Sequence, residues 1–287
     1  LRAFVHRPEG EGPFPTIYFL QGYTCGSVEF AAEPHPLGRL IRQLVERGYL
    51  VFRIEKPGVG DSEGTPDCMS INFPTELEAF RAGYRYLLKL SRVDRDQVFL
   101  YGHSLGGIVA PLLASEFHPR GVMVYGTGLY AWHDYMIELA RDQFPRDGSD
   151  YAEVEELIQR GKPLLHEFFV EKKHPRDIGE TPEEKALFGQ MLLGYDGHET
   201  VTNRHYTFWQ TINDLNLVEA WKNTNAAVLS MYGAYDVAAL DSDAMEKIAE
   251  IVNHYHPGNG RFELIPDTDH GLALVESKAH KLQLQQQ

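Results

Sequence analysis

The residues best suited to covalent chemistry are a serine and its flanking glycines, in the pentapeptide G-H-S-L-G at residues 102–106. An apolar run, residues 98–101, precedes it, and a second one, residues 107–113, follows. A buried strand that turns through G-x-S-x-G into a helix lifts the serine hydroxyl above the edge of a parallel sheet. The strained turn leaves room only for glycine at its flanks, and the start of the helix favours negative charge. A bare pentapeptide also occurs by chance, but its flanking segments make Ser104 a candidate nucleophile.

A serine needs a base to activate it and a third group to orient that base. Two downstream loops supply these groups. Asp236 follows the apolar run 227–233, and His270 follows the run 261–266. His270 would take the proton from Ser104, while Asp236 would fix the tautomer of the imidazole and stabilise its charged form.

Two other carboxylates compete for the role of the acid. Asp241 and Asp243 lie just beyond Asp236, and they also suit the first turn of a helix that continues through residues 245–251. Asp236 is favoured because it lies nearest to the end of the preceding strand, where ligand and catalytic groups gather in α/β sheets.

The 13 histidines of the chain raise the question of a metal site. His254 and His256 are close in sequence, but no cluster of Cys, Asp or Glu completes a ligand set, so the end of a surface helix is the favoured interpretation. His103 is interpreted as a structural residue of the turn. No dinucleotide-binding glycine pattern follows the first strands. We therefore expect no metal and no organic cofactor.

The elements that must position these residues alternate along the chain. Apolar runs of strand length are separated by segments with helical spacing of apolar residues, so a mainly parallel sheet covered by helices on both faces is expected. The expected strands are residues 1–6 (an antiparallel edge strand), 16–21, 49–54, 98–101, 122–125, 227–233 and 261–266, and the expected helices include 37–47, 74–90 and 105–117.

These motifs together resemble the α/β-hydrolase superfamily over nearly the whole chain. The resemblance is carried by G-H-S-L-G-G at 102–107, G-A-Y-D-V at 233–237 and D-H-G at 269–271, in the order Ser, Asp, His. Residues 51–62 are similar to the glycine-rich turn of that family. Residues 1–8, together with residues 12–15, look most like esterases and peptidases related to the prolyl oligopeptidase catalytic domain.

The resemblance also implies an oxyanion hole. Residues 16–23 look like the family's oxyanion strand and loop, so the backbone N–H groups of Leu105 and Tyr23 are the expected donors. Gln21 stands where the family more often has histidine. We expect Gln21 to form a hydrogen bond within the loop and to leave the Tyr23 amide in place, and the Tyr23 hydroxyl is a further candidate to face the pocket.

The alternation of strands and helices stops at residues 129–223, where helix formers and charged residues predominate and no convincing buried strand is found. In the α/β-hydrolase fold a helical cap is inserted here, after the sixth strand. The resemblance thus implies a core domain of residues 1–128 and 224–287 and a helical cap of residues 129–223. Trp132 and Trp209 are the first candidates to bind substrate, although most cap aromatics only pack the cap.

The leading interpretation is a serine hydrolase that cleaves carboxylic esters through an acyl-enzyme intermediate. A peptidase or amidase, a thioesterase or a carbon–carbon bond hydrolase would use the same three residues. A receptor without catalytic activity is the alternative from another class, because a fold alone does not determine function. In each case the expected partner is a small molecule, such as an ester, a short peptide or an amide.

Composition limits the other classes of partner. The chain has 287 residues, 43% of them hydrophobic, and a net charge of −14. This size supports one large α/β domain with an insertion. The acidic balance argues against nucleic acid or anionic membrane as partners, since both select basic surfaces. Nothing in the composition indicates an oligomeric state.

Two cysteines and the start of the chain bear on the cellular compartment. Cys25 and Cys68 fall in expected loops, and we expect free thiols because a chain of this size needs no staple, with one disulfide as the alternative. No run approaches the roughly 18–20 apolar residues of a membrane-spanning helix. Because Leu1 lies inside an expected strand, we expect that residues precede it, where a signal peptide or another domain remains an option. The compartment stays open, with the cytoplasm favoured.

Overall fold

A computed structural model describes residues 1–29, 35–62, 64–240 and 242–277 of the chain. Its residues divide into two compact units. The first contains Leu1–Thr65, Leu77–Leu129 and Leu217–Gln287, and the second contains Pro66–Glu76 and Tyr130–Asn216.

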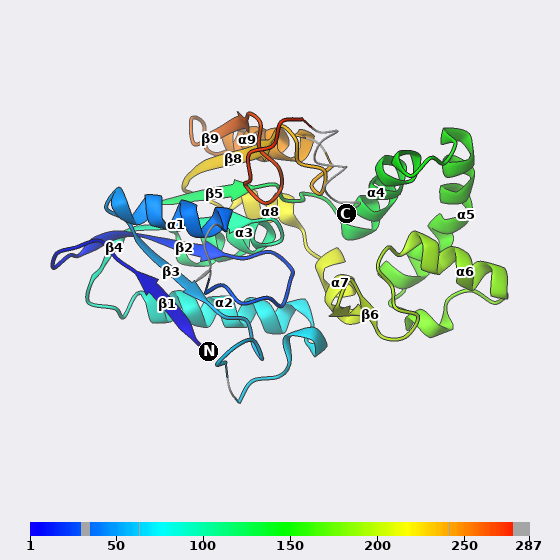
Figure 1. Ribbon diagram of the computed structural model, residues 1–287, viewed down its shortest axis with the longest axis horizontal. Helices are drawn as coiled ribbons and strands as arrows, with labels where there is room; N and C mark the ends of the chain where they lie inside the picture. The colour runs from blue at the N-terminus through cyan, green and yellow to red at the C-terminus, as the bar shows by residue number, and fades with distance from the viewer. Residues whose placement is uncertain (30–34, 63, 241, 278–287) are drawn as a thin grey trace. The chain divides into compact units, whose positions relative to one another are not determined.

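The first unit is built on a seven-stranded sheet with the strand order β1-β3-β2-β4-β5-β8-β9 (Figure 1). Strand β1 runs antiparallel to β3, and all the other neighbouring strands are parallel. The mainly parallel sheet with an antiparallel edge strand is thus confirmed. The strands are β1 (Ala3–His6), β2 (Phe14–Leu20), β3 (Leu50–Ile54), β4 (Val93–His103), β5 (Gly121–Tyr125), β8 (Ala227–Gly233) and β9 (Gly260–Ile265).

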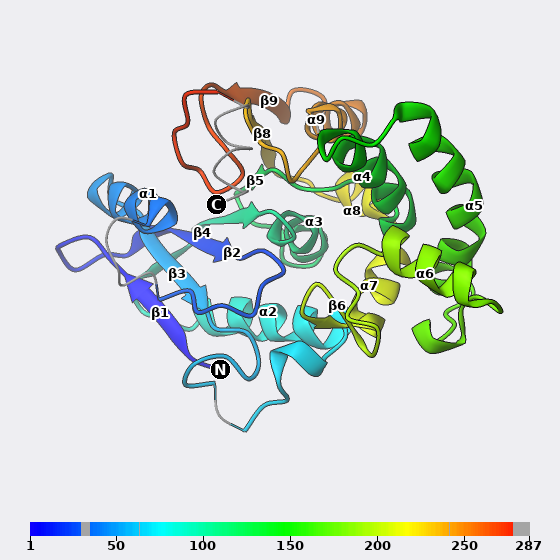
Figure 2. The same cartoon turned by 45° about the vertical axis from the view of Figure 1, so that its right-hand side comes forward.

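Both faces of the sheet are covered because its central strands are apolar on both sides, as expected for parallel strands. Alternate side chains point to opposite faces. Ile17 and Phe19 of β2 pack against Leu37 and Ile41 of helix α1 (Pro36–Glu46). Tyr18, between them in the sequence, packs against Phe80 of helix α2 (Phe73–Leu87). Figure 2 shows α1 and α2 on opposite sides of the sheet.

The remaining helices of the first unit are short or closely packed. Helix α3 (Gly106–Phe117) begins two residues after Ser104 and is buried along most of its length. Helix α8 (Leu217–Lys222) contacts α3 and α9 (Asp243–Tyr255). Helix α9 packs on β8, where the Ser230 hydroxyl donates a hydrogen bond of 2.7 Å to the Met245 carbonyl.

The second unit consists mainly of helices, and its largest segment follows β5 in the chain. They are α4 (Trp132–Arg146), α5 (Tyr151–Phe169), α6 (Pro182–Met191) and α7 (Tyr206–Asn213), with short 3-10 turns at Cys68–Ser70 and Pro175–Asp177. Helix α6 begins with a capping box, in which Thr181 and Glu184 exchange side-chain to backbone hydrogen bonds.

The expectation that this region contains no strand was wrong, because the structure has a small hairpin here. Strands β6 (Thr200–Val201) and β7 (Arg204–His205) pair antiparallel around a turn in which Thr202 and Asn203 have positive φ. Such a turn is typical of two-residue hairpin loops. Strands of two residues are too short for an alternating pattern to reveal them in the sequence.

The expectation of free thiols was also wrong. Cys25 and Cys68 are both disulfide-bonded, and no free cysteine is found among the described residues. The size of the chain shows that a disulfide is not needed for a stable core, but it does not say which loops meet. Within the described ranges, no helix has the length and apolarity needed to span a membrane.

Candidate active site

The turn at Ser104 requires its glycines for steric reasons. Ser104 has φ 54°, and its N–H donates a hydrogen bond of 2.9 Å to the Tyr125 carbonyl on the neighbouring strand. A side chain at position 102 would collide with the backbone of Gly106, and one at position 106 would collide with the Leu20 carbonyl at the end of β2. The turn therefore lies tightly between the ends of β2 and β5, which holds Ser104 in a strained conformation.

Asp236 and His270 form a hydrogen-bonded pair at the same edge of the sheet. The Nδ1–H of His270 donates to Oδ2 of Asp236 over 2.7 Å. The other carboxylate oxygen accepts hydrogen bonds from the backbone N–H groups of Ala238 (2.8 Å) and Ala239 (2.9 Å). Every one of these donors orients the carboxylate, so Asp236 can fix the tautomer of His270.

Asp236 remains a carboxylate although it is completely buried. Burial by itself raises the pKa of an acid, but the hydrogen bond and charge of His270 and the two alanine amides outweigh it, so the pKa of Asp236 lies below its ordinary value. The pair is thus arranged to hold a positive charge on the imidazole when His270 accepts a proton.

The loop that carries His270 is held by two residues of neighbouring strands. His103, next to Ser104, donates a hydrogen bond from Nε2–H to the His270 carbonyl over 2.6 Å. The Tyr125 hydroxyl donates to the Asp269 carbonyl, also over 2.6 Å. Burial, followed by the nearby His270 imidazole, lowers the pKa of His103 to about 4. His103 is therefore a neutral donor near pH 7 and joins the Ser104 turn to the His270 loop.

Gly126 also belongs to the site, although the sequence analysis did not identify it. It has φ 56°, and a Cβ at this position would lie 2.6 Å from Oδ2 of Asp236 and 3.0 Å from Nδ1 of His270. Any side chain here would push apart the hydrogen-bonded pair. The signal in the sequence was a glycine directly after a strand, which marks a close backbone approach.

The expected oxyanion loop lies beside the serine. A Cβ on Gly22 would lie 3.2 Å from Cβ and 3.5 Å from Oγ of Ser104. The Gly22–Tyr23 peptide group, which carries the Tyr23 N–H, therefore lies next to the serine. Leu105 is buried and caps helix α3. Gln21 does not bond within its loop as expected; its Nε2 donates to the Ile54 carbonyl at the end of β3 over 3.1 Å.

Asp243 and His256, two of the alternative candidates, have other roles in the structure. Asp241 falls outside the described residues, and Asp243 is the first residue of α9. His256 donates from Nε2–H to the Lys222 carbonyl over 2.8 Å, which fits the expected end of a helix. The described parts of the chain contain no group of three His, Cys, Asp or Glu residues that could hold a metal ion.

The two candidate substrate residues, Trp132 and Trp209, stack on each other in the second unit. Their ring centroids lie 4.7 Å apart with an interplanar angle of 29°. Trp209 is buried and its indole N–H donates to the Val201 carbonyl over 2.7 Å, whereas Trp132 is partly exposed. Trp209 thus has the contacts of a core residue, and Trp132 keeps a surface that a ligand could contact.

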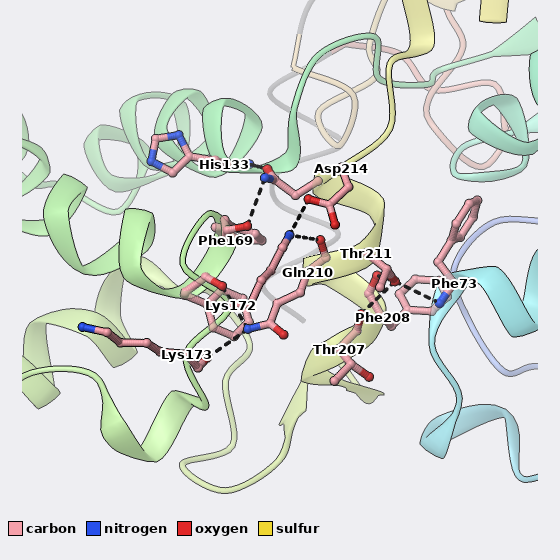
Figure 3. Close-up of polar contacts among 12 residues, drawn as sticks. Phe73, His133, Phe169, Lys172, Lys173, Thr207, Phe208, Gln210, Thr211 and Asp214 are labelled. Atoms are coloured by element: carbon pink, nitrogen blue, oxygen red, sulfur yellow. Dashed lines mark hydrogen bonds and ion pairs between the residues drawn. The ribbon is translucent and has the colours of Figure 1, made fainter.

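Polar side chains join the end of helix α5 to helix α7 in the second unit (Figure 3). The Nε2 group of Gln210 donates to the carbonyls of Phe168 and Lys173, both over 2.9 Å. The ammonium group of Lys172 donates to the Gln210 carbonyl over 2.6 Å and pairs with Asp214 at 2.5 Å. The end of α5 and helix α7 are thereby joined by hydrogen bonds as well as by aromatic packing.

Comparison with known proteins places the chain in a family. The sequence matches the family described as X-Pro dipeptidyl-peptidase (S15 family) over residues 1–254. No curated protein matches the sequence significantly.

Solved structures share the fold at low sequence identity. Est1E from Butyrivibrio proteoclasticus with bound ferulic acid has a TM-score of 0.60 and 16% identity, covering 99% of this chain and 94% of its own. MenH from S. aureus has a TM-score of 0.54 and 18% identity, covering 99% of this chain and 96% of its own. The acylaminoacyl peptidase of Pyrococcus horikoshii has a TM-score of 0.57 and 12% identity, covering 98% of this chain and 37% of its own. The predicted α/β-hydrolase fold is confirmed.

Proposed function

The chain belongs to the X-Pro dipeptidyl-peptidase (S15) family, a family of α/β hydrolases, and we propose that it hydrolyses small carboxylic esters through an acyl-enzyme on Ser104. The observation that carries the proposal is the hydrogen bond between the buried Asp236 and the partly exposed His270, whose loop is joined to the Ser104 turn through His103. A histidine with no catalytic role on the surface would need neither the hydrogen bond to Asp236 nor a loop anchored by His103. Their combination favours a base that is oriented for proton transfer.

The proposed reaction proceeds in two halves. Oγ of Ser104 attacks the ester carbonyl while Nε2 of His270 takes its proton, and the backbone N–H groups of Leu105 and Tyr23 donate to the oxyanion. The alcohol leaves with the proton from His270, and the acyl group stays on Ser104. Water then attacks the acyl-enzyme with His270 again as the base, which releases the acid and restores Ser104.

The choice of an ester is supported by the structural neighbours. Est1E binds ferulic acid, a carboxylic acid, and a neighbour from Bacillus coagulans is described as a carboxyl esterase. Esters also have better leaving groups than amides, so the same three residues act on them with fewer further demands on the site.

Cleavage of peptides after an X-Pro unit is the second candidate function, and the family match favours it. The acylaminoacyl peptidase among the structural neighbours also has a peptide-cleaving activity in its name. A peptidase would use the same attack by Ser104 and would differ in protonating an amine leaving group from His270.

Two measurements on the purified protein test both candidates. A fluorophosphonate probe should label Ser104, identified by mass spectrometry of the labelled peptide, and labelling should be lost in Ser104→Ala. Hydrolysis is then measured on a series of p-nitrophenyl esters and on dipeptide X-Pro p-nitroanilides. Cleavage of the esters without cleavage of the anilides supports the esterase, and cleavage of the X-Pro anilides that is lost in Ser104→Ala replaces it with the peptidase. Absence of labelling at Ser104 contradicts both.

A further inference from the structure

Three charged residues at the end of β3 hold the loop that follows β2, and all three are buried. Nε of Arg53 donates to the Val28 carbonyl over 2.8 Å. The Glu55 carboxylate accepts hydrogen bonds from the Ser27 hydroxyl and the Val28 N–H. Nζ of Lys56 donates to the Gly22 carbonyl over 2.6 Å. Burying a charge costs free energy unless the charge is paired or hydrogen-bonded, so these three contacts are expected to fix the conformation of this loop.

Lys56 differs from the other two in what its contact does to the backbone. The carbonyl of Gly22 and the N–H of Tyr23 belong to one peptide group. In a trans peptide the C=O and the N–H point in opposite directions. A donor that binds the Gly22 carbonyl therefore also determines the direction of the Tyr23 N–H, the proposed oxyanion donor.

The sheet places Lys56 and Ser104 on opposite sides of this peptide. Strand β2 lies between β3 and β4 (Figures 1 and 2). The β2–β3 register pairs Tyr18 with Phe52, and continuing it along both chains brings Gly22 level with Lys56. The β2–β4 register pairs Leu20 with Gly102, and the same continuation brings Gly22 level with Ser104.

From this arrangement we propose that Lys56 is a positioning residue for the oxyanion hole. Its ammonium group holds the Gly22 carbonyl on the β3 side, so that the Tyr23 N–H faces the β4 side, where Ser104 lies. The contact from a cation is a charge-assisted hydrogen bond. It also polarises the peptide group, which makes its N–H a stronger donor to a developing negative charge. This inference rests on the proposed function, because it assigns the Tyr23 N–H to the oxyanion.

The test compares Lys56→Met with a matched variant, Arg53→Met. Both substitutions remove a buried cation that binds a carbonyl of the same loop: Arg53 binds the Val28 carbonyl, and Lys56 binds the Gly22 carbonyl of the peptide beside Ser104. The probes are p-nitrophenyl butyrate and a butyl trifluoromethyl ketone, whose adduct with a serine carries an oxyanion. Both are first measured on the wild type and on Ser104→Ala.

Lys56→Met should lower kcat by about 10-fold to 100-fold with little change in KM, below the roughly 10²–10³-fold loss of a whole oxyanion donor. The inhibition constant of the ketone should rise by a similar factor, because ketone and transition state use the same donor. Arg53→Met should lower the melting temperature and keep kcat and the inhibition constant within about threefold of wild type, since its contacts lie further along the loop. Lys56→Gln, which keeps a neutral amide donor, should fall between wild type and Lys56→Met, and it provides the measurement if Lys56→Met does not fold.

The outcomes separate this inference from the proposed function. Activity and ketone binding in wild type, with both lost in Ser104→Ala, support the proposed function whatever Lys56 does. The inference is then overturned if the Lys56 variants keep wild-type kcat, if they lower kcat without weakening ketone binding, or if Arg53→Met weakens ketone binding to the same extent. Full activity in Ser104→Ala overturns the proposed function and the inference with it.

Discussion

The sheet edge of the first unit and the helical interior of the second unit both contain side chains that donate to backbone carbonyls, but the two regions differ in what these contacts hold. At the sheet edge, His103, Tyr125 and Lys56 each donate to a backbone carbonyl of a neighbouring loop. The backbone of Gly126 packs directly against the Asp236–His270 pair. In the second unit, Gln210 and Trp209 also donate to backbone carbonyls, but these contacts, together with stacked rings such as Trp132 on Trp209, join the elements of that unit and hold none of the candidate triad residues.

This difference indicates where each unit is sensitive to substitution. Backbone anchors at strand ends leave little freedom, so a change at the sheet edge should alter the geometry of reacting groups and hence the rate. Side-chain packing between helices relaxes more readily, so a change in the second unit should alter stability or the ranking of substrates. The following predictions test that division.

The largest effect is expected at the nucleophile. Ser104→Ala should reduce kcat for p-nitrophenyl esters by about 10⁶-fold, because no other group forms the acyl-enzyme. The fold should persist, since the substitution removes only the hydroxyl; circular dichroism and the melting temperature check this. Retention of more than a few per cent of the activity in purified variant would refute the assignment.

The second effect concerns the acid. Asp236→Asn should reduce kcat by about 10⁴-fold, because an amide no longer fixes the His270 tautomer that accepts the serine proton. Asp243→Asn is the matched control and should leave kcat nearly unchanged, because Asp243 begins helix α9. Steady-state kinetics of the two variants decide the matter, and a larger loss at Asp243 than at Asp236 would assign the acid to Asp243.

The third effect lies in the second unit and concerns the free energy of unfolding. Arg204 and Glu76 form an ion pair of 2.7 Å in which both side chains are fully buried. The Arg204 guanidinium also lies 3.6 Å from the centre of the Phe208 ring. Glu76→Gln should lower the free energy of unfolding by about 3–5 kcal/mol, because it removes the carboxylate charge that binds the buried Arg204 guanidinium.

Replacing both members of this pair tests the reason for that loss. The double variant Glu76→Met with Arg204→Met removes both charges and should be more stable than Glu76→Gln alone, as measured by urea unfolding. A double variant less stable than Glu76→Gln would show that the two residues stabilise the fold by more than neutralising each other's charge.

The fourth effect compares two stacked residues. Trp132→Ala should change the ratio of kcat/KM between short and long acyl esters by about 10-fold to 200-fold, if the partly exposed ring contacts the acyl group. Trp209→Ala should instead lower the free energy of unfolding by about 3–5 kcal/mol and keep the ranking of esters, because Trp209 is buried. Acyl-chain profiles and melting temperatures are measured on both variants. An unchanged ranking in both would move specificity to the loops of the first unit.

The smallest effect is a dependence of stability on pH. The folded-state pKa of His103, about 4, lies below its unfolded value near 6.5. The unfolded chain therefore binds the proton first, so stability is kept above pH 6.5 and lost as the pH falls from 6.5 towards 4. At pH 5.5 the loss should reach about 1 kcal/mol. His103→Gln cannot titrate, so its free energy of unfolding should fall less steeply over this range, and equal slopes would contradict the prediction.

Much of the framework could be predicted from the sequence, because strands, helices and the serine turn depend on neighbours close in the chain. The positions of β2, β3, β5 and β8 followed from short apolar runs between turn residues. The hairpin around Thr202 was missed because its strands have only two residues each. The disulfide of Cys25 and Cys68 was missed because the sequence does not tell which loops meet.

Contacts between distant residues were decided only by the tertiary structure. The sequence by itself determined the type of fold, the strained turn at Ser104 and the order of the candidate serine, acid and base. It did not determine that Asp236 is the carboxylate bonded to His270, that His103 binds the His270 loop, or that Lys56 comes level with Gly22. These pairings depend on strand order and register, which bring together the ends of strands that are far apart in the chain.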